Sequence, residues 1–368
     1  MRKIRSIAYF SHMQFVSGRK QIALMADEKS PARISHRLLA INRSEMRFNM
    51  AKKREFYFKS SDGVNRVHTV EWSPEDGAVK AVLHIVHGMA ERVGRYDDFA
   101  RFMADNGYLV VGDDHLGHGK TAASPEDFGY IGEDGAHLLV RDEHKLQRHM
   151  KELYPVVPYI ILGHSMGSYI TRRFISIYGE DVDACLILGT GFQTPAETGA
   201  GLTVAGLVGK LKGQRHRSDF LTELGFGKYC SRIENPRTES DWMCRDDKVI
   251  DDFKNDPLCD FIFTVDGFKA LLTLVREDCD DRTARKVPKE LPIYILSGAE
   301  DPVGQYGEGV MKTYEQYKQA GIEDLQVKIY PQMRHEILNE FGKEEVYDDI
   351  LRWTEEKIAE CADEEDEI

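Results

Sequence analysis

The sequence has no long hydrophobic run: none of its apolar stretches approaches the roughly 20 residues that a membrane-spanning helix needs. Positive charge is also scarce, because 62 acidic residues outnumber 49 lysines and arginines and leave a net charge of −13. Such a surface repels polyanions, so we expect no nucleic acid partner. The six cysteines include no C-x-x-C pair, which indicates free thiols in a reducing compartment and hence a cytoplasmic protein.

The first 49 residues differ from the rest of the 368-residue chain. They contain ten lysines and arginines against three acidic residues and show no sustained hydrophobic periodicity. We expect residues 1–49 to be a basic leader that precedes the true start at Met50 or is disordered. An organellar transit peptide is the alternative.

Short apolar strands alternate with helical patterns along the remaining chain. The expected strands are at 54–60, 66–72, 81–86, 108–112, 158–162, 184–188, 293–297 and 326–330. The expected helices are at 96–106, 135–153, 165–178, 310–320 and 346–361. This alternation predicts an α/β fold with a mostly parallel eight-stranded sheet and helices on both faces.

The alternation of strands and helices stops once. Residues 192–288 form a mixed, glycine-rich and charged stretch with several short helical patterns, which we interpret as an inserted helical cap. The core then has two parts, residues 50–191 and residues 289–368, and the second part ends in an acidic tail.

The motif "GHSMGS", residues 163–168, contains the pattern G-x-S-x-G between an expected strand and an expected helix. Two glycines around a serine allow a sharp strand-to-helix turn that leaves the hydroxyl exposed. The motif therefore predicts Ser165 as a nucleophile.

A serine hydroxyl needs a general base and a third group that orients the base. In a parallel sheet, such groups gather at the carboxyl ends of strands. His335 follows the last expected strand and is the one histidine downstream of Asp301, so it is the predicted base. Asp301 follows the strand at 293–297 and is the predicted orienting acid, with Glu300 as the alternative.

Acyl transfer also places negative charge on a carbonyl oxygen, which backbone N–H groups stabilise best. Met166, the residue after the nucleophile, is predicted to supply one N–H. The loop after the strand at 81–86 should supply the second, and we assign it to Met89. Gly88 and Ala90 lie one position away and remain alternatives.

A group of histidines and aspartates could suggest a metal site. His84 and His87 are separated by an odd number of residues along a strand and therefore face opposite sides, which spoils a shared ligand set. We expect no metal and no cofactor. The other members of the group are His115, His118, Asp113 and Asp114. Their segment, "DDHLGHGKT", is interpreted as a glycine-rich loop beside the serine turn.

With these motifs in order, the chain from about Glu55 to Trp353 resembles the α/β-hydrolase superfamily, in particular its monoacylglycerol lipase and lysophospholipase branch. The motifs that carry the resemblance are "HGMAERVGRY", "DDHLGHGKT", "GHSMGS", "SGAEDPV" and "RHEILNE". Three positions depart from the family pattern: Ser168 stands in place of a glycine, Arg92 in place of a histidine and Thr121 in place of a serine.

The resemblance implies a serine hydrolase that cleaves carboxylic esters, often of single-chain lipids, beneath the cap. It implies the same catalytic roles for Ser165, Asp301 and His335. A serine peptidase or amidase of the same fold is the alternative, and a non-catalytic binding module is the alternative from another class.

Within the cap, residues 199–217 join an apolar stretch to four basic residues, which predicts a helix that covers the site, with peripheral membrane contact as an additional role.

Overall fold

The computed structural model describes residues 51–366, so the leader expected over residues 1–49 lies outside the described residues. An eight-stranded sheet forms the centre, in the order β1-β2-β4-β3-β5-β6-β7-β8. The strands are β1 (Lys52–Lys59), β2 (Arg66–Ser73), β3 (Ala81–Val86), β4 (Tyr108–Asp113), β5 (Tyr159–His164), β6 (Ala184–Leu188), β7 (Ile293–Gly298) and β8 (Leu325–Tyr330). β2 pairs antiparallel with β1 and β4, and the remaining pairs are parallel.

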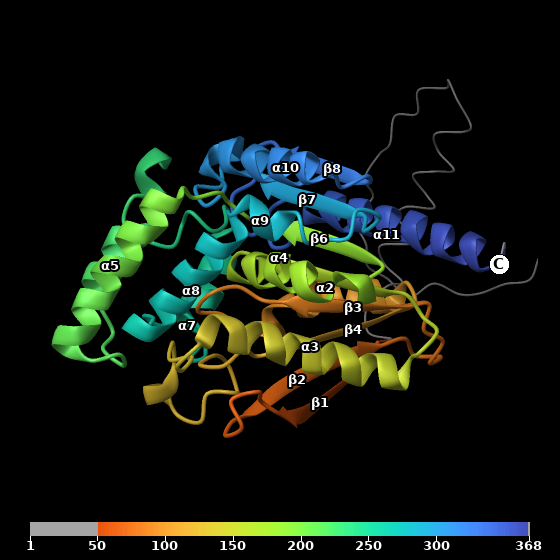
Figure 1. Ribbon diagram of the computed structural model, residues 1–368, viewed down its shortest axis with the longest axis horizontal. Helices are drawn as coiled ribbons and strands as arrows, with labels where there is room; N and C mark the ends of the chain where they lie inside the picture. The colour runs from red at the N-terminus through yellow and green to blue at the C-terminus, as the bar shows by residue number, and fades with distance from the viewer. Residues whose placement is uncertain (1–50, 367–368) are drawn as a thin grey trace, which may run out of the picture. The chain divides into compact units, whose positions relative to one another are not determined.

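Helices cover both faces of this sheet (Figure 1). Side chains alternate along each strand, so Ile161 of β5 packs toward one helix layer while Leu162 packs toward the other. The layer on the side of Ile161 contains α3 (Gly135–Leu153), α4 (Met166–Tyr178) and α10 (Glu308–Ala320). The opposite layer contains α2 (Asp97–Asp105) and α11 (Lys343–Asp366), which continues through most of the acidic tail.

A helical insertion separates β6 from β7. It contains α5 (Pro195–Lys212), α6 (Asp219–Phe226), α7 (Asp247–Asn255), α8 (Val265–Asp278) and α9 (Asp281–Ala284). Its first helix starts with a capping box, in which Thr194 accepts a hydrogen bond from the Glu197 N–H and the Glu197 carboxylate accepts one from the Thr194 N–H. Figure 1 shows α5 at one end of the molecule, packed against α8.

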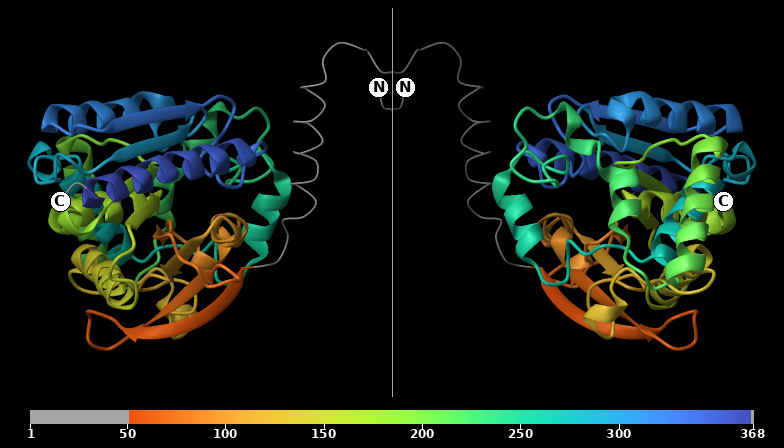
Figure 2. Two further views of the ribbon diagram at one scale, coloured as in Figure 1. Left: turned by 90° about the vertical axis from the view of Figure 1, so that its right-hand side faces the viewer. Right: turned by 90° about the vertical axis from the view of Figure 1, so that its left-hand side faces the viewer.

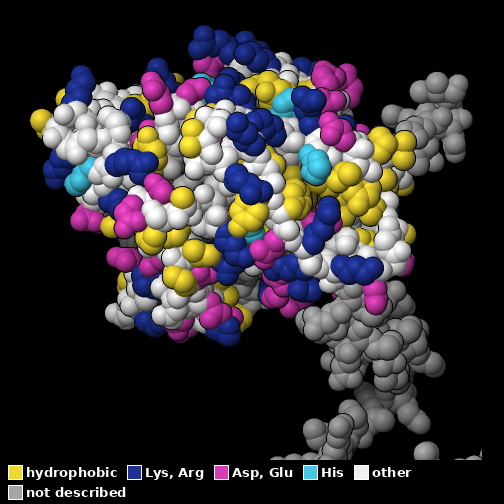
Figure 3. All heavy atoms as spheres, turned by 90° about the horizontal axis from the view of Figure 1, so that it is seen from below, with side chains coloured by type: hydrophobic (Ala, Val, Ile, Leu, Met, Phe, Trp, Pro, Cys, Tyr) yellow, Lys and Arg dark blue, Asp and Glu magenta, His cyan; other side chains and the backbone are white. Residues whose placement is uncertain are grey.

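The predicted fold is confirmed: the eight expected strands are present, each within two residues of its expected bounds. Figure 2 shows the twist of the sheet, with β1 and β8 at its opposite edges. Figure 3 views the molecule from the side of β1, where basic and acidic side chains are interspersed. Within residues 51–366, no helix combines the length and the hydrophobicity that crossing a bilayer requires.

Candidate active site

Ser165 occupies a sharp turn between β5 and α4. Its φ of 55° and ψ of −120° place a residue with a side chain in a strained backbone region. A Cβ added at Gly163 would lie 2.3 Å from the Gly167 carbonyl oxygen, and one added at Gly167 would lie 2.0 Å from the Val86 carbonyl oxygen. Gly163 is therefore required for packing α4 against β5, and Gly167 for packing α4 against β3.

The carbonyl oxygen of Ser165 is fastened to the first turn of α4. Ser168 donates to it from its backbone N–H at 2.9 Å and from its hydroxyl at 2.6 Å, which gives this departure from the family pattern a local role. Met166 is the first residue of α4, where backbone N–H groups have no acceptor within the helix. The strained turn thus presents a hydroxyl and an N–H side by side.

His335 and Asp301 lie in contact at the carboxyl ends of β7 and β8. The Nδ1–H of His335 donates to Oδ2 of Asp301 at 2.9 Å, and both side chains are buried. The second oxygen of Asp301 accepts the Val303 N–H at 2.8 Å. Glu300 is half exposed and lies 4.0 Å from Arg334, so the structure brings Asp301, and not Glu300, to the histidine.

The His335 ring lies beside the serine turn, and its other nitrogen is not held by the protein within the described residues. Its Nε2 is buried and has no hydrogen-bond partner among the described residues. The ring centroids of His335 and His164, the residue before Ser165, are 4.7 Å apart. Ser165 and His335 both line one cavity of about 910 Å³. This geometry leaves Nε2 available to accept a proton from the serine.

The loop after β3 contains the three alternatives for the second N–H donor. The Gly88 N–H donates to Oε1 of Glu91 at 2.7 Å, and the Ala90 N–H donates to Nε2 of His118 at 3.2 Å. Their hydrogen bonds leave Met89 as the alternative whose N–H can serve a substrate. Met89 lines the same cavity, as does Met166.

A buried charge network lies behind the site. Arg95 donates to Glu91 at 2.8 Å and to both carboxylate oxygens of Glu336 at 2.7 and 2.8 Å. Glu91 accepts the Gly88 N–H in the loop after β3, and Glu336 follows His335 in the loop after β8, so one guanidinium binds both loops. Although burial opposes it, the Glu91 carboxylate raises the pKa of the neighbouring His164.

Sequence reasoning missed this network. Glu91 and Arg95 stand four positions apart within "HGMAERVGRY", a spacing that is compatible with an ion pair. Glu336 lies 241 positions after Arg95, and no local pattern connects them.

Aromatic residues of the insertion pack beside His335. The Trp242 ring lies 5.0 Å from the His335 ring, and the Tyr229 ring lies 4.9 Å from the Trp242 ring. Apolar side chains of the insertion also line the cavity: Val204, Leu221, Phe226, Phe261, Phe268 and Leu271. The cavity is thus closed on one side by the core and on the other by the insertion.

The remaining two departures from the family pattern also have contacts. Nε of Arg92 donates to Asp256 of the insertion at 2.7 Å. The Thr121 hydroxyl accepts the His68 N–H at 2.9 Å and so joins its loop to β2. Arg92 therefore joins the loop after β3 to the insertion, and Thr121 joins the loop after β4 to β2.

The sheet order, the strained serine turn between β5 and α4, and the insertion after β6 together define an α/β-hydrolase. The family model described as serine aminopeptidase, S33, matches residues 77–342. The chain belongs to this family, within its monoacylglycerol lipase-like branch, as predicted.

Relatives and solved structures agree with this assignment. The chain is 26% identical to a monoacylglycerol lipase of Mycolicibacterium smegmatis, with 82% of this chain and 96% of that protein covered. It is 26% identical to the monoglyceride lipase of Homo sapiens, with 78% and 86% covered. A thermostable carboxyl esterase from Bacillus coagulans, solved with glycerol, is similar at a TM-score of 0.78 and 31% identity, with 83% of this chain and 99% of that chain covered.

Proposed function

We propose that the protein is a serine hydrolase that cleaves carboxylic esters of single-chain lipids through an acyl-enzyme intermediate. Ser165 is the nucleophile, His335 the general base and Asp301 the group that orients the base. The backbone N–H groups of Met89 and Met166 form the oxyanion hole.

The reaction begins when the Ser165 hydroxyl attacks the ester carbonyl carbon and passes its proton to Nε2 of His335. The negative charge then moves to the carbonyl oxygen, which accepts hydrogen bonds from Met89 and Met166. Collapse of this intermediate breaks the ester bond, and His335 returns the proton to the departing alcohol. Water activated by the same histidine then releases the acid and restores the serine.

One observation carries this proposal: the Nε2 of His335, which lines the same cavity as Ser165, is buried and has no hydrogen-bond partner within residues 51–366, while Nδ1 is held by Asp301. A fluorophosphonate probe should label Ser165 covalently. Ser165→Ala should remove both the labelling and the esterase activity. Full turnover by this variant would contradict the serine mechanism.

The class of reaction follows from the comparisons. Relatives named monoacylglycerol lipase and a similar structure named carboxyl esterase support the predicted carboxylic ester hydrolase, although the family description names an aminopeptidase. A parallel assay with p-nitrophenyl esters and aminoacyl p-nitroanilides separates the two reactions. Faster cleavage of the anilides would favour the peptidase alternative.

The cavity favours a substrate with a long apolar part. Its volume of about 910 Å³ is near the upper end of the about 300–1,000 Å³ typical of ligand pockets. The side chains that the insertion contributes to the lining are largely aliphatic or aromatic. The insertion therefore acts as a cap that shields an acyl chain, and the alcohol part of the ester lies toward the catalytic residues.

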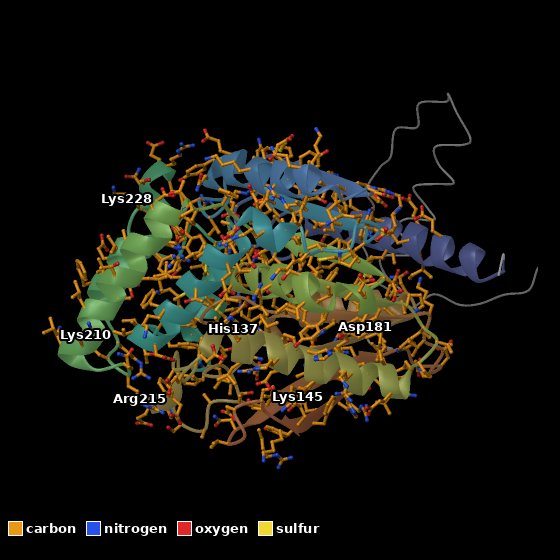
Figure 4. All side chains as sticks on the ribbon, in the orientation of Figure 1. His137, Lys145, Asp181, Lys210, Arg215 and Lys228 are labelled. Atoms are coloured by element: carbon orange, nitrogen blue, oxygen red, sulfur yellow. The ribbon has the colours of Figure 1, made fainter. Side chains whose placement is uncertain are left out.

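The outer face of the cap has the composition of a membrane-contact surface. Leu207 and Leu211 of α5 are 55% and 86% exposed, and Phe220 and Leu224 of α6 are 61% and 59% exposed. Figure 4 shows Lys210 at the end of α5, beside these leucines in sequence. Apolar side chains flanked by lysines can enter the acyl boundary while the ammonium groups meet anionic lipid.

Vesicle sedimentation tests this contact. Wild-type protein should sediment at low salt with vesicles that contain anionic lipid, and Lys210→Glu combined with Lys212→Glu should sediment less. Turnover of a soluble short-chain ester should be unchanged in the double variant. Wild-type protein that stays in the supernatant would exclude the membrane contact and leave the ester hydrolase proposal intact.

A further inference from the structure

A second cluster of ionisable side chains lies beneath the active-site loops. Asp113 ends β4, His115 follows in the next loop, and Glu143 comes from α3, which packs over the sheet beside β3 (Figure 1). Each of the three side chains is at most 2% exposed. One ligand atom from each lies within 4.8 Å of those of the other two.

The atoms of this cluster lie within ion-pair distance of one another, but their angles do not meet those of hydrogen bonds. Nδ1 of His115 lies 3.2 Å from Oδ1 of Asp113 and 3.1 Å from Oε1 of Glu143. Among the described residues, none of these atoms has a hydrogen-bond partner, and neither do the second oxygens of the two carboxylates. Buried polar atoms in native proteins are rarely left without partners, so the cluster requires an explanation.

Contacts with neighbouring residues hold the His115 and Glu143 side chains in orientations suited to binding a metal. Nε2–H of His115 donates to the His87 carbonyl oxygen at 3.0 Å, so the neutral ring carries its lone pair on Nδ1, which faces the two carboxylates. Histidines that bind metals donate their other ring N–H in this way. His84 lies 2.8 Å from the outer oxygen of Glu143, and its own Nδ1 pairs with the Tyr159 hydroxyl at 2.7 Å.

The negative charges of the two carboxylates also favour a bound cation. Two carboxylates this close together repel unless a cation or a proton lies between them. The distances from Nδ1 of His115 to the two carboxylate oxygens are 3.1 and 3.2 Å. Ligands held about 2.0 Å from a tetrahedral zinc ion are separated by about 3.3 Å.

We propose that Asp113, His115 and Glu143 bind a divalent transition-metal ion, with Zn²⁺ as the best match to one imidazole and two carboxylates. The second oxygen of Asp113 would complete the coordination, since the second oxygen of Glu143 faces His84. An imidazole ligand favours Zn²⁺ over Mg²⁺ or Ca²⁺, which prefer oxygen alone. The ion is structural, because its ligands lie outside the cavity of Ser165.

A bound metal would stabilise the loop after β3, which contains Gly88 and Met89. The His115 ring stacks on the His87 ring at a centroid distance of 3.8 Å, and the His115 N–H donates to Nε2 of His87. Nδ1–H of His87 in turn donates to the Gly88 carbonyl oxygen at 2.7 Å. A bound ion would therefore fix the rings on which this loop rests.

Metal analysis tests the site in the full-length protein. Protein produced with added Zn²⁺ and purified without chelators should contain about one equivalent of divalent metal by mass spectrometry. Asp113→Asn and Glu143→Gln should each lose it. Asp142→Asn is the matched control, because this neighbouring buried carboxylate binds Ser60 and Ser61 instead and should leave the metal content unchanged.

Refolding of the wild type provides a test that needs no variant. Protein unfolded with a chelator and refolded with Zn²⁺ at 100 times its Kd should melt about 4 °C higher than protein refolded without it. Circular dichroism should confirm equal refolding in both samples. Negligible metal in the purified protein together with an unchanged Tm would overturn the proposal, and so would equal metal loss in the Asp142→Asn control.

Discussion

The hydrogen bonds of Asp301 allow the effect of Asp301→Asn to be worked out atom by atom. Oδ1 accepts the Val303 N–H, and Oδ2 accepts Nδ1–H of His335. The asparagine carbonyl must keep the Val303 bond, because a buried N–H left unpaired is costly. Its amide NH₂ therefore faces His335, whose Nδ1 becomes an acceptor. The ring proton then moves to Nε2, where the base needs a lone pair.

The expected loss follows from this wrong tautomer. A comparable change in a serine protease triad lowers kcat by about 10⁴-fold, which corresponds to about 5.4 kcal/mol of transition-state stabilisation at about 1.36 kcal/mol per factor of ten. We expect a similar loss here, with KM little changed, because Asp301 lies behind the base and away from the cavity wall.

The assay is steady-state hydrolysis of a short-chain p-nitrophenyl ester, with thermal melting as the measure of folding. Glu300→Gln is the matched control, since Glu300 is adjacent in sequence, half exposed and 4.0 Å from Arg334. It should keep wild-type kcat. A loss of less than tenfold in Asp301→Asn, or a greater loss in Glu300→Gln, would refute the assignment of the orienting acid.

Three further predictions follow from contacts in the structure. Gly167→Ala should lower Tm and remove most activity, because the new Cβ would lie 2.0 Å from a β3 carbonyl oxygen. Gly206→Ala is the control: this position of α5 faces open space, so the substitution should raise stability by about 0.5–1 kcal/mol. Val204→Asp should slow hydrolysis of long-chain esters more than of short-chain esters, because Val204 lines the cavity, and Leu207→Asp on the exposed face of α5 should affect both equally when the substrate is soluble. Glu91→Gln should reduce Tm most below about pH 6.5, and the difference from wild type should shrink as pH rises through the raised pKa of the histidine before the nucleophile.

The core could be predicted from the sequence because its strands are short, apolar and buried on both faces. Five strands, among them β5, are fully buried along their length, so hydrophobicity alone marks their bounds. The serine turn directly follows β5, and Asp301 and His335 lie in the loops after β7 and β8, so the sequence could predict that these loops meet. The short helices of the insertion could not be placed individually, because contacts with the core and with one another determine them.

The polar clusters could not be predicted from the sequence, because their members lie far apart in the chain and meet only in the folded protein. The group from β3 and β4 was expected to hold no metal because His84 and His87 face apart. Glu143 was not considered, since it lies on a helix 28 positions after His115 in the sequence. Only the fold brings that carboxylate to the end of β4. The exposure of Leu207 could not be predicted either, because the packing of α5 against α8 determines which face of α5 is buried.

The single guanidinium of Arg95 has a consequence for how this enzyme can change over evolution. The loop after β3, which contains Glu91, and the loop after β8, which contains Glu336, share one partner, so neither loop can shift without straining the other. Lysine could not replace this arginine, because a single ammonium lacks the planar fork that binds Glu336 through two bonds while also reaching Glu91. New substrate preferences are therefore more accessible through the cap, whose side chains line the cavity without taking part in this network.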